Sequence, residues 1–163
     1  MNPYLIVFLL TFIPWLEQRY SIPIGILSGS ITLPFGFTLQ AYGLPWWWVL
    51  LVAASANIIV GVIAYIVIDK AVHLLFFWRG FERFWHRRIE KTQKRIRGYV
   101  ERYGLLGMSL FIAIPLPGSG VYTGAIGSYA LGLGFRKFFI ANVIGVLLSA
   151  MIITLITLGV GSL

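Results

Sequence analysis

The sequence predicts an all-α integral membrane protein built from two inverted repeats, each a re-entrant helical hairpin plus one transmembrane helix, joined by a basic amphipathic cytoplasmic helix. Its 163 residues are 59% hydrophobic and only 11% charged, whereas soluble domains carry about 25% charged residues. Two apolar stretches are long and unbroken, and two others are interrupted by Gly and Pro. We therefore treat residues 1–163 as a single membrane domain.

The first predicted repeat, residues 1–69, has a broken apolar segment followed by a continuous one. Residues 3–45 contain many Gly and Pro residues, which are tolerated at membrane depth only where protein or a cavity covers the backbone. We expect a re-entrant hairpin here. If it turns at Pro23–Gly25, Glu17 and Arg19 lie near its tip or on its descending arm. Residues 46–68 carry no charge and exceed the ~20 residues that a transmembrane helix needs.

The second predicted repeat, residues 104–163, has the same order. Residues 104–134 are interrupted by prolines and glycines and are expected to form the second re-entrant hairpin. Residues 138–158 are the second predicted transmembrane helix. Short sequence echoes between the halves, such as Ala-Asn in each long helix, favour a repeat. Matching broken segments in two halves point to a transporter site near the midplane.

The connector, residues 70–103, carries ten of the thirteen Lys and Arg residues. A basic loop between apolar halves is expected to be cytoplasmic, which places both termini outside a multi-pass plasma-membrane protein. The same placement of charge argues against nucleic acid as a partner. The connector either lies among anionic head groups as an amphipathic helix or is a solvated link, and both interpretations stay open.

Glu17 and Arg19 are the only charged residues among the first 68, and a charge at membrane depth is usually functional. Glu17 can bind and release a proton, and the fork of Arg19 suits a phosphate or carboxylate. The alternatives are an internal ion pair that closes the hairpin, or side chains that reach the outer head groups.

The second hairpin contains hydroxyl groups and glycines around Pro115–Gly124. Unpaired backbone N–H groups at a helix start can bind an anion without a charged side chain, although small residues also allow tight packing. The predicted substrate-binding residues are Glu17, Arg19, Ser21, Pro23, Gly25, Pro115, Pro117, Gly118, Ser119, Gly120, Tyr122, Thr123 and Gly124. Asn57 and Asn142 are expected to bond between helices. The chain has no Cys and no pattern of catalytic or metal-binding residues in its membrane portion, so we expect neither an enzyme nor a cofactor.

The run acid-x-Arg-x-x-Ile-Pro-x-Gly at Glu17–Gly25, the Pro-Leu-Pro-Gly-Ser-Gly run and Thr123–Gly124 resemble the family of putative small multidrug export proteins. More distantly, the paired hairpins and residues 134–145 resemble the DedA/SNARE-associated (VTT) superfamily. That resemblance implies inverted repeats and movement of phospholipids or polyprenyl-phosphate carriers, often linked to protons. DedA-type proteins place arginines around the second hairpin's proline, where this chain has Ile112, Ala113, Gly118 and Ser119.

Three functions follow as expectations. The first is a transporter or scramblase for an amphipathic anionic substrate, such as a lipid phosphate, linked to protons through Glu17. The second is export of small hydrophobic or cationic compounds, with Glu17 as the counter-charge. The third is a membrane scaffold with a lipid-binding basic helix. The expected partners are membrane lipids, a small amphipathic substrate, protons and a second copy of the chain, because re-entrant backbone must be covered.

Overall fold

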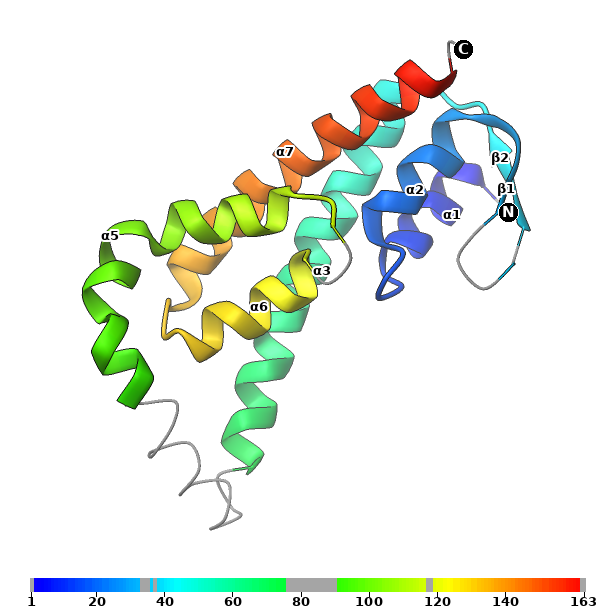
Figure 1. Cartoon of the computed structure of the whole chain (residues 1–163). Helices are drawn as coiled ribbons and strands as arrows, with labels where there is room; N and C mark the ends of the chain where they lie inside the picture. The colour runs from blue at the N-terminus through cyan, green and yellow to red at the C-terminus, as the bar shows by residue number, and fades with distance from the viewer. Residues whose placement is uncertain (1, 33–35, 37, 76–90, 117–118, 162–163) are drawn as a thin grey trace.

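The computed structural model describes residues 2–32, 36, 38–75, 91–116 and 119–161, with only the backbone at 75, 91–101 and 161. Most of these residues are helical (Figure 1). The helices are α1 (Pro3–Thr11), α2 (Glu17–Ile26), α3 (Trp46–Leu75), α5 (Lys91–Ala113), α6 (Val121–Ala130) and α7 (Phe135–Gly161). The strands are β1 (Ser28–Thr32) and β2 (Thr38–Tyr42).

Two long apolar helices, α3 and α7, are present where the sequence predicted them. They have 30 and 27 residues, so both extend beyond the predicted ranges 46–68 and 138–158. At about 1.5 Å per residue, each is longer than the roughly 30 Å hydrocarbon core of a bilayer. Length and composition therefore allow both helices to cross a membrane.

The turn of the first hairpin lies between α1 and α2, before Glu17, and not at Pro23–Gly25. Pro23 is inside α2, where its missing N–H removes one hydrogen bond. Only three residues of α2 follow it, so little of the helix depends on that bond. Gly25 packs tightly, because a Cβ there would lie 2.6 Å from a methyl group of Val49 in α3.

A β-hairpin follows α2, which the all-helical prediction missed. Strands β1 and β2 pair antiparallel from Ser28↔Tyr42 to Thr32↔Thr38. We had assigned this Gly- and Pro-rich stretch to the re-entrant hairpin. Pairing between two strands is another way to satisfy backbone N–H and C=O groups, and the Gly and Pro residues are also typical of turns between strands.

The predicted connector does not form a separate element in the described residues. Residues 70–75 continue α3, and α5 begins at Lys91 and runs on into the apolar stretch that ends at Ala113. Residues 76–90, which include much of the predicted amphipathic helix, lie outside the described residues. After α5 the chain turns and enters α6. Among the described residues, each half has two helices before a long one, whereas their inverted relation and re-entrant insertion stay predictions.

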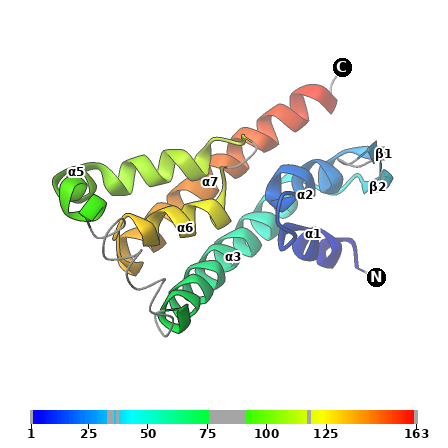
Figure 2. The same cartoon turned by 60° about the horizontal axis from the view of Figure 1, so that its bottom comes forward.

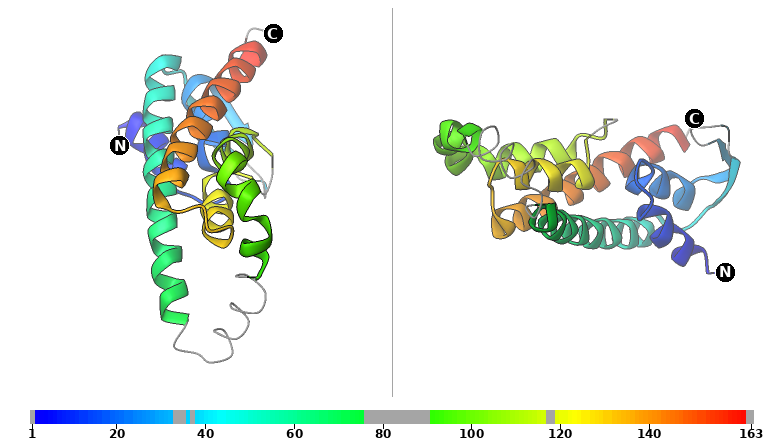
Figure 3. Two further views of the ribbon diagram at one scale, coloured as in Figure 1. Left: turned by 90° about the vertical axis from the view of Figure 1, so that its left-hand side faces the viewer. Right: turned by 90° about the horizontal axis from the view of Figure 1, so that it is seen from below.

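The two halves pack together through the long helices (Figure 2). Helix α7 contacts α2 and α3 of the first half, and α6 packs against α3, α5 and α7. Figure 3 shows α1, α2 and the β-hairpin at one end of the molecule, with the start of α5 toward the other. This packing brings the start of α2 to the start of α6.

Candidate functional site

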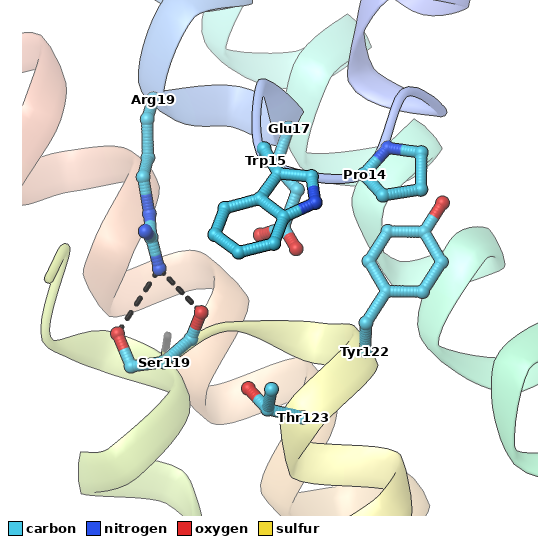
Figure 4. Close-up of a pocket in the computed structure, with 7 residues that line it drawn as sticks. All are labelled: Pro14, Trp15, Glu17, Arg19, Ser119, Tyr122 and Thr123. Carbon is cyan, nitrogen blue, oxygen red and sulfur yellow. Dashed lines mark hydrogen bonds between the residues drawn. The ribbon is translucent and has the colours of Figure 1, made fainter. Parts of the chain in front are cut away.

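A cavity of about 160 Å³ lies where the turn between α1 and α2 meets the start of α6. Both halves line it (Figure 4). Its lining residues are Pro14, Trp15, Glu17, Arg19, Ser119, Tyr122 and Thr123. Five of the predicted site residues therefore meet around one cavity, although about 100 positions separate the two groups in the chain.

Glu17 reaches from the first half to the start of α6. Its side chain is only 6% exposed, and its carboxylate accepts a hydrogen bond from the backbone N–H of Val121. Its own backbone has φ +43°, a left-handed conformation that costs a non-glycine residue about 1 kcal/mol or more. Because Gly120, at the N-cap of α6, makes no side-chain capping bond, the Glu17 carboxylate takes the place of a cap.

Gly120 makes this approach possible. Its φ of +116° suits glycine far better than any other residue. A Cβ at this position would lie 2.6 Å from Oε2 of Glu17 and 3.2 Å from Nη2 of Arg19. The glycine therefore leaves space for both charged side chains. At least one backbone N–H at the start of α6, that of Val121, faces a carboxylate of the protein itself and not the anionic ligand expected there.

Arg19 holds the turn between α5 and α6. Its Nη2 donates to the backbone carbonyl of Ser119 at 2.6 Å and to its hydroxyl at 3.0 Å. The Ser119 hydroxyl is also within hydrogen-bond distance of the carbonyls of Ile114 and Leu116. Arg19 is thus joined to the group that organises this turn.

Glu17 and Arg19 are neighbours without a direct ion pair. Within the part of the chain that the structure describes, the one contact with ion-pair geometry joins Asp69 and His73 at 3.6 Å, and it is an ion pair only when the His73 ring carries a proton. Burial raises the pKa of the Glu17 carboxyl group to about 7, against opposing effects of the Arg19 charge and the Val121 N–H donor. Near neutral pH, Glu17 can therefore both take up and release a proton.

Aromatic rings form the other walls of the cavity. Trp15 is 79% exposed, and in Figure 4 its ring lies over Glu17, between Arg19 and Tyr122. The Tyr122 hydroxyl donates to the carbonyl of Phe12 at 2.6 Å, which ties α6 to the turn after α1. Sequence reasoning missed Pro14 and Trp15 as lining residues, although they come just before Glu17 in the chain.

Other predicted site residues lie outside the lining of this cavity. Ser21 is fully buried and shares a 2.7 Å hydrogen bond with Thr11 of α1. Gly124 allows close contact with Ile112, since a Cβ would come within 2.7 Å of that side chain. The remaining ones are Pro23 and Gly25 in α2, Pro115 in the turn after α5 and Gly120 beneath Glu17, whereas Pro117 and Gly118 are outside the described residues.

Asn57 and Asn142 are both buried in the long helices. Asn142 donates from Nδ2 to the carbonyl of Ile58 at 3.1 Å, a bond between α7 and α3 of the kind we expected. For metals, the described residues contain no group of three or more His, Cys, Asp or Glu side chains that could hold an ion.

Comparison with known proteins gave a family match. No match was found among curated proteins or among solved structures. Residues 17–152 match the family described as "putative small multi-drug export protein". The matched range begins at Glu17 and includes both sides of the cavity, whereas the more distant resemblance to the DedA superfamily stays a prediction. The chain belongs to the family of putative small multi-drug export proteins.

Proposed function

We propose that this chain is a membrane transporter that moves an amphipathic anionic substrate, most simply a lipid phosphate, together with a proton. The observation that carries the proposal is the meeting of Glu17 and Arg19 with the turn before α6. A titratable carboxyl group and a fixed cation share one small cavity between the halves. Matched broken segments in two halves are where transporters place their sites.

The charges favour an anion. Both bonds from Arg19 to Ser119 use Nη2, so the donors on Nη1 and Nε are not needed for them. Arg presents a planar fork of donors that matches phosphate. An ionised Glu17 would repel such a head group, whereas a protonated Glu17 would not. Anion binding and protonation of Glu17 therefore favour each other, and the two would be carried in the same direction.

The size of the cavity limits what enters it. Pockets for drug-sized ligands have volumes of about 300–1,000 Å³, whereas this one has about 160 Å³. It suits a head group rather than a whole amphiphile. The apolar tail would then lie outside, along exposed apolar side chains such as Leu106 and Leu110 of α5, among the lipid chains.

A second candidate is export of small hydrophobic cations, which fits the description of the family. The rings of Trp15 and Tyr122 flank Glu17 in the cavity, and aromatic faces beside a carboxylate attract organic cations. Arg19 works against this candidate, because its charge would repel the same ligand.

The topology completes the proposal. We place the chain in the plasma membrane with residues 70–103 on the cytoplasmic side and both termini outside, as the positive-inside rule predicts. A second copy would cover re-entrant backbone that is costly to expose to lipid. Neither statement is needed for the chemistry of the cavity.

Reconstitution in liposomes tests the function. We expect the protein to move a fluorescent polyprenyl phosphate between leaflets, and Glu17→Gln and Arg19→Ala to lower the rate at least about tenfold. Glutamine cannot release the proton that accompanies the anion, and alanine lacks the guanidinium fork that would hold the phosphate. Matched controls are Asp69→Asn, an acid that is 46% exposed, and Arg136→Ala, an exposed arginine at the start of α7. Unchanged movement in both site variants would overturn the mechanism. Proton-driven efflux of a cationic dye, without lipid movement, would select the second candidate.

A further inference from the structure

Three amide side chains are buried near the place where α2, α3 and α7 meet. Gln18, Asn57 and Asn142 have exposures of 2%, 1% and 0%. Within the described residues, the amide oxygen of each one has no hydrogen-bond partner. Buried polar atoms without partners are rare in native proteins, and a bound water or ion is a common explanation.

The register between α3 and α7 places these amides close to one another. The rings of Tyr65 and Phe138 stack at 4.8 Å between centroids. Gly61 is one turn before Tyr65 in α3, and Asn142 is one turn after Phe138 in α7. Gly61 faces Asn142. The two helices are therefore antiparallel, and a further turn sets Asn57 opposite Val146. Gln18 is at the same level, because its Nε2 donates to the Val146 carbonyl at 3.3 Å.

The hydrogen bonds fix the direction of two of the amides. Asn142 donates to the carbonyl of Ile58, and Gln18 donates to that of Val146. A carbonyl can only accept a hydrogen bond, so the NH₂ end of each amide must face it. The oxygen ends of Gln18 and Asn142 are therefore the free ends. A ligand for these oxygens must therefore be a hydrogen-bond donor or a cation, and not another acceptor.

We propose that the oxygens of Gln18, Asn57 and Asn142 bind a monovalent alkali cation at the crossing of α3 and α7. Amide and carbonyl oxygens are ligands for hard cations, and transporters coordinate sodium with backbone carbonyl oxygens. A single charge fits better than a double one, because the three side chains are all neutral. Gly61 lets the Asn142 amide lie directly against α3, since a Cβ there would come within 2.5 Å of that amide. The inference goes beyond the proposed function and does not depend on the substrate or on Glu17.

Thermal unfolding of the purified full-length protein in detergent tests the site. The salts are sodium, potassium and choline chloride at equal ionic strength. A ligand that binds only the folded state raises Tm, and we expect sodium or potassium to raise it by about 2–4 °C over choline. Whichever of the two gives the larger shift is the preferred ion. An identical Tm in all three salts would overturn the proposal and leave a site for water only.

Variants of Asn57 test whether the difference in Tm between alkali salts and choline chloride arises at this cluster. Asn57→Leu removes an oxygen and should abolish the difference between alkali cation and choline. Asn57→Asp keeps an oxygen and adds a negative charge, so its difference should exceed that of the unaltered protein. This variant keeps the test decisive if Asn57→Leu does not fold. Thr154→Val is the matched control, since Thr154 is also buried without a partner in the described residues but lies two turns beyond Val146. A full shift in Asn57→Leu, or a reduced one in Asn57→Asp, would contradict the proposal.

Discussion

The two helical hairpins contribute opposite kinds of group to one cavity. The start of α2 supplies charged side chains, Glu17 and Arg19, whereas Ser119 and the start of α6 supply a backbone N–H, a carbonyl and hydroxyls. Neither hairpin forms the site alone. The charged residues thus already have partners within the protein, and an anion at Arg19 would use the donors that Ser119 does not occupy.

The largest expected effect concerns Glu17 as a titrating group. Its folded pKa is about 7 and its ordinary value is 4.5, so the folded protein binds more protons than the unfolded chain between these values. Stability from this group is therefore lost as pH rises from about 4.5 to 7, by up to roughly 3 kcal/mol. Unfolding measured across that range should show a fall for the unaltered protein that Glu17→Gln lacks. Parallel pH profiles for the two proteins would show that Glu17 is not desolvated.

Gly120→Ala should disrupt the contact between the two hairpins at the start of α6. The new Cβ would meet the Glu17 carboxylate, and the positive φ disfavours alanine, so we expect a loss of about 2–3 kcal/mol and loss of transport. Gly107→Ala is the matched control, because nothing lies within 4 Å of a Cβ there and alanine favours a helix by roughly 1 kcal/mol. Denaturation and transport are measured for both. Equal stability of the Gly120→Ala and Gly107→Ala variants would contradict the close contact between Gly120 and Glu17.

Arg19→Ala removes the hydrogen bonds that the Arg19 side chain donates to Ser119. We expect about 2 kcal/mol of destabilisation, which is typical for hydrogen bonds to a charged group. Arg19→Lys keeps the charge without the planar fork and should recover part of the stability but little of the transport. If Lys restored transport fully, Arg19 would act as a point charge rather than as a fork for a phosphate.

Tyr122→Phe is the mildest change. It removes the bond from the Tyr122 hydroxyl to the carbonyl of Phe12 and keeps the ring, so a cost of about 1 kcal/mol is expected. Anionic substrate should still be moved at near the normal rate, whereas Tyr122→Ala would remove a wall of the cavity. A large transport defect in Tyr122→Phe would assign the hydroxyl a direct role in binding.

Part of this arrangement could be predicted from the sequence. The long apolar helices follow from length and lack of charge alone, and Glu17 and Arg19 stand out because charge is rare in that half. The sequence could not show that Pro23 lies inside a helix, since a single proline is compatible with a turn or with a short helix. Nor could it show the strands at 28–42, because Gly and Pro mark turns of every kind.

The partners of the charged residues were also beyond sequence reasoning. Contacts from Glu17 to Val121 and from Arg19 to Ser119 depend on how the two halves pack. No local sequence pattern predicts contacts between residues that are about 100 positions apart in the chain. The same holds for Trp15, whose place in the cavity comes from the left-handed turn at φ +79°. The one local signal for Trp15 is its position two residues before the isolated charge of Glu17.

The most direct test of the central claim is transport of a fluorescent polyprenyl phosphate under an imposed proton gradient. If Glu17 binds a proton together with the substrate, an inward gradient should speed inward movement by the unaltered protein. Glu17→Gln should be slower and insensitive to the gradient, while Asp69→Asn should respond normally. A full response to the gradient in Glu17→Gln would contradict the account, because the cavity between the hairpins would then not couple the proton to the anion.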